Sequence, residues 1–501
     1  MDAASLVKQW LGGRASVDDE GRLQFESPRQ MGLAAKARRA YRWIAEQSLL
    51  PGSLDMQWDV RQRLAHNGHV IGLSERENLS SFILLPLLTL MTSRRMVFVG
   101  APGHGKTTMA TVMGLLAGYS LTQIRRAVQH GHPQLTVSDL LGSPLPSDLV
   151  RAESTKEIQV AWREWIPLRV KIIDEYNRIP TKTQSALLSL MAEGYAEMFE
   201  QVIEAGRSAW FLTANDDMGG GTFPVIEALQ DRIDVVVRSA PFHARHLHVL
   251  ADRITSDDSA EQHVPRDIVF TAEELDQADR EIRAVTLSNE VLELLGFFLG
   301  QLDFCRRASD ELDSMNKDTL HLSGRRVAQV CTEDCPLDKQ LNLCSQTERG
   351  VSPRTYQSII HYAKALAYFR GNQEVALEDL RQLIPWLLFD KVRVNPQSQF
   401  FQKTENKVYL MDRAAWLRQM FDRALQQHAA YTPVRAPLAQ LEQDLHHAET
   451  LTAAQLQRKQ QEIMSHMKHL LEKHELNGPV HQDLMRLKML HARCRQAAIP
   501  M

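Results

Sequence analysis

The sequence predicts an α/β protein whose core is a parallel sheet flanked by helices, with further helical regions before and after that core. Three short apolar runs predict strands of the sheet: residues 97–99, 170–173 and 212–214. Glycine follows the first run and polar side chains follow the other two, and apolar residues continue at helical spacing over 109–116. Parallel strands are buried by helices on both faces. Residues 65–240 therefore predict the α/β core.

A glycine-rich loop directly follows the first predicted strand, because residues 100–107 read G-A-P-G-H-G-K-T. The pattern G-x-x-x-x-G-K-[ST] is specific for a phosphate-binding loop when a strand precedes it and a helix follows. Its glycines let backbone N–H groups curl toward phosphate oxygens, and the positive end of the helix points at the same anion. Lys106 adds a cation for the outer phosphates, and Thr107 places a hydroxyl where Mg²⁺ needs an oxygen. The residues predicted to bind the nucleotide belong to the loop and its helix: Gly100, Pro102, Gly103, His104, Gly105, Lys106, Thr107 and Thr108.

Polar side chains end the other two predicted strands. Asp174 and Glu175 follow residues 170–173, and Asn215 follows residues 212–214. A carboxylate at a strand end can hold Mg²⁺ through water, and the next carboxylate can polarise an attacking water. Because a phosphate-binding loop precedes these residues, the pattern predicts hydrolysis of the nucleotide as well as binding.

The run 174–188 resembles the signature of MoxR-type AAA+ ATPases, which typically reads D-E-I-N-R-A-P-P-K-T-Q-S-A-L-L; Tyr176 replaces the usual apolar residue. The similarity covers roughly residues 65–395. Four further segments agree with the family in order: residues 69–72 with the adenine-contacting V-x-G stretch, 138–142 with S-D-[IL]-x-G, 227–233 with E-A-x-x-D-R-F (Ile233 in place of Phe), and 350–354 with G-x-S-P-R.

The resemblance implies roles for individual residues on the nucleotide side. Val70 and Gly72 would contact adenine. Thr107 and Asp174 would hold Mg²⁺ beside the phosphates, and Glu175 would activate the attacking water. The implied cofactors are ATP or ADP with Mg²⁺, and the implied fold is an AAA+ core with an all-helical lid.

The resemblance also implies that subunits share sites. Asn215 would be the first sensor, Arg232 an arginine finger that reaches the nucleotide of a neighbouring subunit, and Arg354 the lid sensor, acting on its own or on a neighbouring nucleotide. Phosphoryl transfer spreads charge over equatorial oxygens, and a planar guanidinium matches that charge. A homo-oligomeric ring, in this family most often a hexamer, is therefore expected.

We expect four regions in the chain. Residues 1–64 form an N-terminal helical extension, 65–240 the ATPase core, and 241–395 the helical lid. An insertion at about 303–349 interrupts the lid, and residues 396–501 form a C-terminal helical hairpin of coiled-coil-like character.

Prolines and caps divide the C-terminal region in this prediction. Residues 410–429 predict one helix, Pro433 and Pro437 punctuate the chain, and Leu438 begins another helix. Thr452 is expected to cap the next helix. Packing is the favoured interpretation of this region, and a partner-docking arm is the alternative.

Four of the five cysteines fall inside the lid insertion. Cys331 and Cys335 have a spacing compatible with zinc ligands, and Cys305 or Cys344 could complete a set. The alternative is a group of buried, reduced thiols, because the spacing is not a paired C-x-x-C.

Composition narrows the class of partner. A formal charge of −3 and a pI near 6.7 give no global attraction for nucleic acid, so a nucleic-acid partner is not expected. The basic cluster at Lys36, Arg38, Arg39 and Arg42 predicts a solvated helix face, with nucleic-acid contact as the alternative. The longest apolar stretch, 82–88, is too short for a membrane span, and residues 1–5 open no apolar signal segment, so a cytoplasmic protein is expected.

Three hypotheses remain for the work that hydrolysis drives. The first is a MoxR-like chaperone that remodels or matures a protein, with metal-cofactor insertion and a von Willebrand factor A (VWA) domain partner as the form that the resemblance suggests. The second is a nucleic-acid motor, and the third is a scaffold whose assembly nucleotide controls. The predicted catalytic residues Glu175, Asn215 and Arg232 argue against a silent scaffold.

Overall fold

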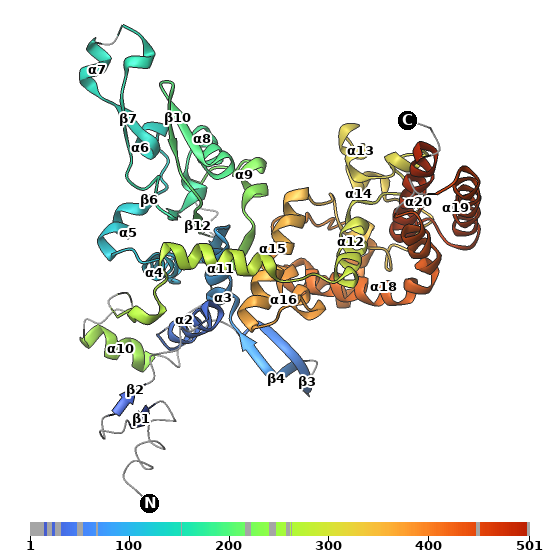
Figure 1. Cartoon of the computed structure of the whole chain (residues 1–501), viewed down its shortest axis with the longest axis horizontal. Coiled ribbons are helices and arrows are strands. Elements are labelled where there is room, and N and C mark those ends of the chain that lie inside the picture. The colour runs from blue at the N-terminus through green and yellow to red at the C-terminus, as the bar shows by residue number, and fades with distance from the viewer. Residues whose placement is uncertain are drawn as a thin grey trace, which may run out of the picture.

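The computed structural model describes residues 15–17, 23–25, 32–47, 54–66, 69–151, 153–215, 222–239, 247–256, 261, 263–446 and 451–497. The α/β core and the C-terminal helices lie at opposite ends of the molecule, and lid helices lie between them (Figure 1). Among the described helices, none combines the length and the apolar character needed to cross a bilayer.

The core is a five-stranded sheet in the order β13-β5-β12-β9-β6, and all neighbouring pairs are parallel. The α/β fold class and the three predicted strands are confirmed. β5, the first of these strands in the chain, lies between β13 and β12, so the phosphate loop that follows β5 emerges beside the end of β12. The strands are β5 (Arg95–Val99), β6 (Val128–His130), β9 (Val170–Asp174), β12 (Ala209–Ala214) and β13 (Val235–Arg238).

Alternating side chains attach helices to both faces of this sheet. Phe98 of β5 and Phe211 of β12 belong to one apolar cluster with α3 (Ser81–Thr92) and α4 (Lys106–Leu116). Val97 and Leu212, the neighbours of those residues, belong to a second cluster with α8 (Thr181–Glu193). Burial on both faces is the reason that the strands read as continuous apolar runs.

Short elements project from this core (Figure 1). Two antiparallel hairpins, β7–β8 and β10–β11, extend on the same side as α7. The bounds of these and the remaining core elements are α5 (Leu121–Ala127), α6 (Val137–Leu141), β7 (Gly142–Pro144), α7 (Pro146–Arg151), β8 (Val160–Trp162), β10 (Tyr195–Met198), β11 (Gln201–Glu204) and α9 (Glu227–Arg232).

The described residues of the N-terminal region form one helix and two antiparallel strand pairs: β1 (Ala15–Val17), β2 (Leu23–Phe25), α2 (Leu33–Gln47), β3 (Met56–His66) and β4 (His69–Leu79). The basic residues of α2 bind the lid side of the molecule. Lys36 pairs with Glu274 at 2.7 Å, and Arg39 pairs with Asp267 at 2.7 Å. Arg38 donates to a main-chain carbonyl at 2.6 Å. Three of the four basic residues on the helix face predicted to be solvated therefore bind other parts of the protein.

The lid is helical, as predicted. Its helices are α10 (Leu247–Ser256), α11 (Ala272–Ala284), α12 (Asn289–Asp303), α13 (Lys317–Leu322), α14 (Val327–Val330), α15 (Pro353–Arg370), α16 (Leu377–Leu387) and α17 (Gln399–Gln402). Thr271 caps α11 in a capping box with Glu274, which confirms the predicted helix start. Lys317 is fully buried and donates to the carbonyls of Leu302 (2.6 Å) and Thr347 (2.7 Å). This lysine therefore ties together the two ends of the predicted insertion.

The cysteines of the insertion do not assemble as a ligand set. Among the described residues, no group of three or more His, Cys, Asp or Glu side chains could hold a metal ion. Cys305 and Cys331 pack with Leu320 and Val327, whereas Cys335 and Cys344 pack in a separate apolar cluster around Phe304, Met315 and Leu337. Burial raises the pKa of the Cys344 thiol to about 12, so the thiol stays neutral. The zinc set predicted from Cys305, Cys331, Cys335 and Cys344 does not form.

After the lid, the described residues form three long helices: α18 (Arg413–Asp444), α19 (Ala453–Lys473) and α20 (Gly478–Ala497). The predicted break at Pro433 and Pro437 is wrong, because α18 runs through both prolines. Each proline removes one backbone N–H, but both are exposed, so water can bind the carbonyls that lose their donor. Buried residues on both sides of the prolines, such as Phe421 and Leu438, hold the helix together. Thr452 caps α19 as predicted.

Candidate active site

The phosphate loop joins β5 to α4 and depends on glycine at defined positions. Gly100 has φ +150°, and a Cβ there would meet Ser239 Oγ at 2.1 Å. Gly103 has φ +78°, and no heavy atom lies within 4 Å of the place its Cβ would take. The first glycine therefore allows close packing against the strand end, and the second leaves room at the mouth of the loop.

A cavity of about 340 Å³ opens around this loop. Its lining combines the loop with two strand ends: residues 102–108, Asp174, Glu175, Thr213 and Asn215. Within the described chain, the buried Nδ1 of His104 in this loop has no hydrogen-bond partner. Backbone N–H groups, an ammonium and hydroxyls around an open cavity are the donors that a nucleotide phosphate requires. The residues present therefore fit the predicted ligand.

Lys106 connects the loop to the predicted sensor. Its Nζ donates to the carbonyls of Gly100 at 2.6 Å and Ala101 at 2.8 Å, and to Asn215 Oδ1 at 2.9 Å. Residues 106 and 215 lie far apart in the chain, but the parallel pairing of β5 with β12 brings their strand ends together. The ammonium is thus held at the place where outer phosphates would lie.

Asp174 is held by two hydroxyls and an imidazole. Thr107 Oγ1 donates to Asp174 Oδ1 at 2.7 Å, and Thr213 Oγ1 donates to the same oxygen at 2.6 Å. His130 Nδ1 lies 3.3 Å from the other oxygen. Oxygen atoms such as those of Thr107 and Asp174 are the ligands that Mg²⁺ prefers, and these two residues would hold the ion, which neutralises phosphate charge when bound.

Glu175 follows Asp174 in a left-handed conformation, with φ 54°. Such a conformation in a non-glycine residue persists only where its surroundings hold it. Here the Glu175 N–H donates to Thr213 Oγ1 at 2.9 Å, Asn215 Nδ2 donates to Oε1 at 2.5 Å, and Arg178 Nη1 donates to Oε2 at 2.8 Å. The carboxylate is therefore oriented toward the cavity at a fixed angle, as a base that activates water must be.

Three residues of this site had no predicted role. Thr213 bridges Asp174 and Glu175; the only signal for it is a polar residue inside an otherwise apolar strand. Arg178 belongs to the matched signature but was not singled out there. His130 ends β6, a strand that the sequence analysis did not predict.

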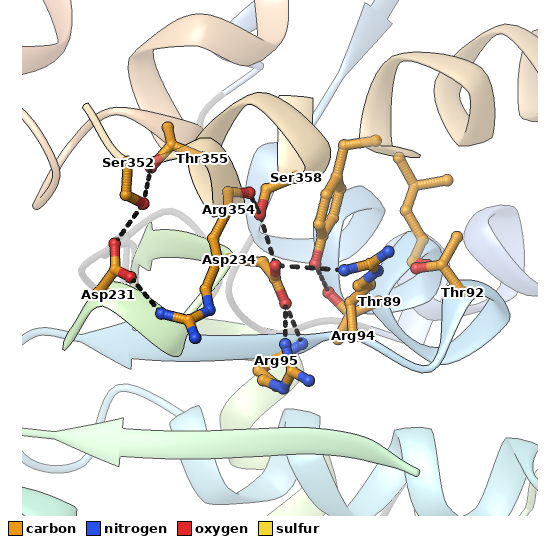
Figure 2. Close-up of polar contacts among 12 residues, drawn as sticks. Thr89, Thr92, Arg94, Arg95, Asp231, Asp234, Ser352, Arg354, Thr355 and Ser358 are labelled. Atoms are coloured by element: carbon orange, nitrogen blue, oxygen red, sulfur yellow. Dashed lines mark hydrogen bonds and ion pairs between the residues drawn. The ribbon is translucent and has the colours of Figure 1, made fainter. Parts of the chain in front are cut away.

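The two predicted arginines lie outside this cavity. Arg232 is half-buried at the end of α9 and donates to the Ala228 carbonyl at 3.2 Å. Arg354, at the start of α15, donates to Asp231 Oδ2 at 3.0 Å (Figure 2). Neither residue lines the cavity around the phosphate loop of its own chain.

The predicted adenine contacts remain a prediction. Val70 and Gly72 lie on β4, paired with Ala65 and Arg63 of β3. The surroundings of their side-chain positions lie outside the described residues.

Two family models match the chain. Residues 95–235 match the model described as ATPase family associated with various cellular activities (AAA), and residues 340–408 match the AAA lid domain. The first match contains the phosphate loop and four of the five strands of the sheet, β5, β6, β9 and β12, and it ends at the first residue of β13. The second extends past the limit near residue 395 that the motifs indicated.

Curated relatives agree with these matches. The chain is 23% identical over 320 residues to an uncharacterised protein, YeaC, of Bacillus subtilis; the alignment covers 63% of this chain and 83% of that protein. It is 22% identical over 304 residues to the chaperone MoxR1 of Mycobacterium tuberculosis, covering 60% of this chain and 68% of that protein.

A solved structure, that of a candidate ATPase from Cytophaga hutchinsonii, is also similar, with 17% sequence identity, a TM-score of 0.47, and coverage of 75% of this chain and 94% of that one. The matched AAA and lid models and the MoxR1 relative agree with the ordered motifs and with the site that the fold assembles from them. The chain is therefore an ATPase and belongs to the MoxR-type AAA+ family.

Proposed function

We propose that the chain hydrolyses ATP as a homo-oligomeric ring, a hexamer by family resemblance, in which Arg232 of one subunit completes the nucleotide site of the next. One observation carries this proposal. The cavity around the phosphate loop is lined by an ammonium, hydroxyls, two carboxylates and an amide. None of its lining residues is an arginine, and the guanidinium of nearby Arg178 is bound to Glu175. A guanidinium that matches the spreading charge of the transition state must then come from elsewhere.

The contacts support separate roles for the polar residues of one site. Lys106 matches charge on the outer phosphates, so a bound nucleotide competes with the carbonyls and with Asn215 for the ammonium. Asn215 is then available to orient the attacking water. Glu175 lies within reach of the same amide, at 2.5 Å, and accepts the proton that the water loses as it attacks. Thr107 and Asp174 hold the Mg²⁺ position.

The test measures ATP turnover per subunit against protein concentration, with sizing in parallel, for the wild type and Arg232→Ala. Wild-type turnover per subunit should rise as subunits assemble. The variant should assemble and bind ATP but turn over about 10³-fold more slowly, because the transition-state charge is left unmatched. The matched control is Arg126→Ala, an exposed arginine paired only weakly with Glu164 at 3.4 Å, which should behave as wild type. Turnover that stays constant across a dilution that dissociates the assembly contradicts the proposal.

We further propose that the ring acts on a protein, as a chaperone-like remodeller, with a VWA-domain protein as the partner class and metal-cofactor insertion as one form of the work. The relative named chaperone MoxR1 supports this choice. The chain has a formal charge of −3, and the cations at Lys36 and Arg39 of α2 are engaged by Glu274 and Asp267. These groups are thus not a free surface for phosphates.

Turnover measured with and without DNA, RNA and a purified VWA-domain protein separates the alternatives. Stimulation by the protein alone is expected. Stimulation by nucleic acid would favour a motor, and nucleotide-dependent assembly with negligible turnover would favour a scaffold.

A further inference from the structure

Helix α9, which ends at Arg232, is too short to hold its own position. It has six residues, and isolated helices of that length are not stable in water. Its orientation must therefore come from its neighbours. On one side it packs against α8 of the core, and on the other side it meets the lid.

Lys391, in the loop after α16, binds the C-terminal end of α9. Its Nζ donates to the carbonyls of Gln230 at 2.6 Å and Asp231 at 2.7 Å. Both carbonyls belong to the last turn of the helix. The Gln230 carbonyl also accepts the Ile233 N–H at 3.2 Å, and a cation there opposes the negative end of the helix. Burial lowers the pKa of Lys391 to about 8, although Asp231 and Asp234 act to raise it.

Two aspartates flank Arg232, and helix α15 of the lid binds both (Figure 2). Asp231 accepts from Ser352 Oγ at 2.6 Å and from Arg354 Nη1 at 3.0 Å. Asp234, which is buried, accepts from Ser358 Oγ at 2.5 Å. The first turns of α15 thus hold the chain immediately before and after the predicted finger.

The start of α9 is bound by the lid as well. Glu227 pairs with Arg349, and Arg393 lies 3.6 Å from the same carboxylate oxygen. Lid residues therefore bind the beginning of α9, its end and Asp234, which also accepts from the Arg95 N–H of β5 at 3.0 Å. Arg232 itself is bonded by its guanidinium only to the carbonyl of Ala228, on its own helix, among the contacts of the described chain.

We propose that Lys391 and the Asp231–Arg354 pair are positioning residues for Arg232, so that the lid of one subunit sets the geometry of catalysis in the neighbouring subunit's site. The inference rests on the proposed function, in which Arg232 acts on the neighbour. A guanidinium contributes to phosphoryl transfer only where its donors meet the developing charge, and a displacement of about 1 Å can cost about 100-fold in rate. A lid that moves would displace α9, because residues of the lid bind both of its ends.

The experiment uses the full chain and mixed assemblies. Lys391→Met removes the donor and keeps the length of the side chain, and Lys391→Arg keeps a cation. Alone, Lys391→Met should lower kcat about 10-fold to 100-fold while the Kd for ATP stays within about twofold, because its own cavity is intact. Lys391→Arg should recover most of the rate. The matched control is Lys364→Met, another lid lysine that caps a carbonyl, but on α11 rather than on α9, at 2.9 Å.

Mixing identifies the site in which the defect is expressed. Glu175→Gln subunits are inactive in their own site but carry an intact α9 and Arg232. Added in increasing amounts to Lys391→Met subunits, they should raise turnover per Lys391→Met site toward the wild-type value, as they should for Arg232→Ala subunits. Ser352→Ala, which removes one donor to Asp231, should show a smaller defect that mixing also rescues.

The outcomes separate the two proposals. Rescue of both Lys391→Met and Arg232→Ala supports the positioning role. Rescue of Arg232→Ala alone overturns that role and leaves the shared site intact. Rescue of neither variant contradicts the shared site, and the positioning role with it. Wild-type turnover by Lys391→Met, or a Kd for ATP that rises in parallel with the loss of kcat, also overturns the positioning role.

Discussion

Charged groups occur both in the nucleotide site, at the carboxyl ends of the strands (here called the sheet edge), and in the lid. The contacts between the charges differ in the two regions. At the sheet edge, the neutral amide of Asn215 lies between Lys106 and Glu175 and bonds to both. In the lid, Arg370 meets Asp379 directly at 2.6 Å. A direct pair offsets the cost of burying two charges and leaves little for a ligand, whereas a neutral bridge can be exchanged for substrate. The comparison predicts that substitutions at the edge change chemistry and that substitutions in the lid change stability.

The largest effect should come from Lys106→Ala. The loss of this ammonium leaves phosphate charge unmatched, and the affinity for ATP should fall about 10³-fold or more. Titration with a fluorescent nucleotide measures this loss. The exposed Lys156, paired with Glu200 at 3.8 Å, provides a matched Lys→Ala control. If Lys106→Ala bound ATP normally but had a lowered melting temperature, Lys106 would act in packing. The contrast between a sheet edge that serves chemistry and a lid that serves stability would then be contradicted.

The next largest effect, a loss of stability, should come from Asp379→Ala in the lid. Asp379 is fully buried and accepts from Arg370 at 2.6 Å and from Trp58 Nε1 at 3.2 Å. Its removal leaves the Arg370 guanidinium with Glu77 and the Trp58 ring as partners, and the free energy of unfolding should fall by about 3 kcal/mol. Urea unfolding measures this change, and the exposed Glu374→Ala serves as the control. A variant of normal stability with slow turnover would reverse the assignment.

A smaller effect, on rate alone, should follow Thr213→Val. The substitution keeps the shape of the side chain and removes the hydroxyl that Asp174 and Glu175 share. We expect kcat to fall about 10-fold to 100-fold through loss of orientation, with the Kd for ATP nearly unchanged. Thr213→Ser should restore most of the rate. Equal loss in the valine and serine variants would mean that the methyl group, not the hydroxyl, is what the site requires.

Thr213 also shows where sequence reasoning ends. Lys106, Asp174 and Glu175 could be predicted because phosphate chemistry requires those residue types at strand ends, and the parallel register then brings them together. Thr213 fills no motif, and its role depends on the strand pairing that only the fold supplies. Lys391 is harder still, because a lysine that caps a helix more than a hundred residues away leaves no local pattern. The fold class followed from apolar runs, but the continuity of α18 through Pro433 depends on packing at both of its ends.

The smallest effect should appear in the C-terminal helices, as a dependence on pH. Burial raises the pKa of Asp483 from 3.8 to about 6, with Glu442 and Glu293 adding to the shift and Arg435 opposing it. Because the folded state keeps this proton after the unfolded chain has lost it, the contribution of Asp483 to stability falls as pH rises from about 4 to about 6. Between those values the free energy of unfolding of the wild type should fall by about 2 kcal/mol relative to that of Asp483→Asn, measured by urea unfolding at each pH.

The control is Glu472→Gln, an exposed position on α19, whose free energy of unfolding should change with pH as the wild type's does. An unchanged slope in Asp483→Asn would mean that Arg435, 3.4 Å away, holds the carboxylate ionised. This contact between α18 and α20 would then resemble the direct Arg370–Asp379 pair of the lid, and the contrast with the bridged charges at the nucleotide site would extend to the C-terminal helices.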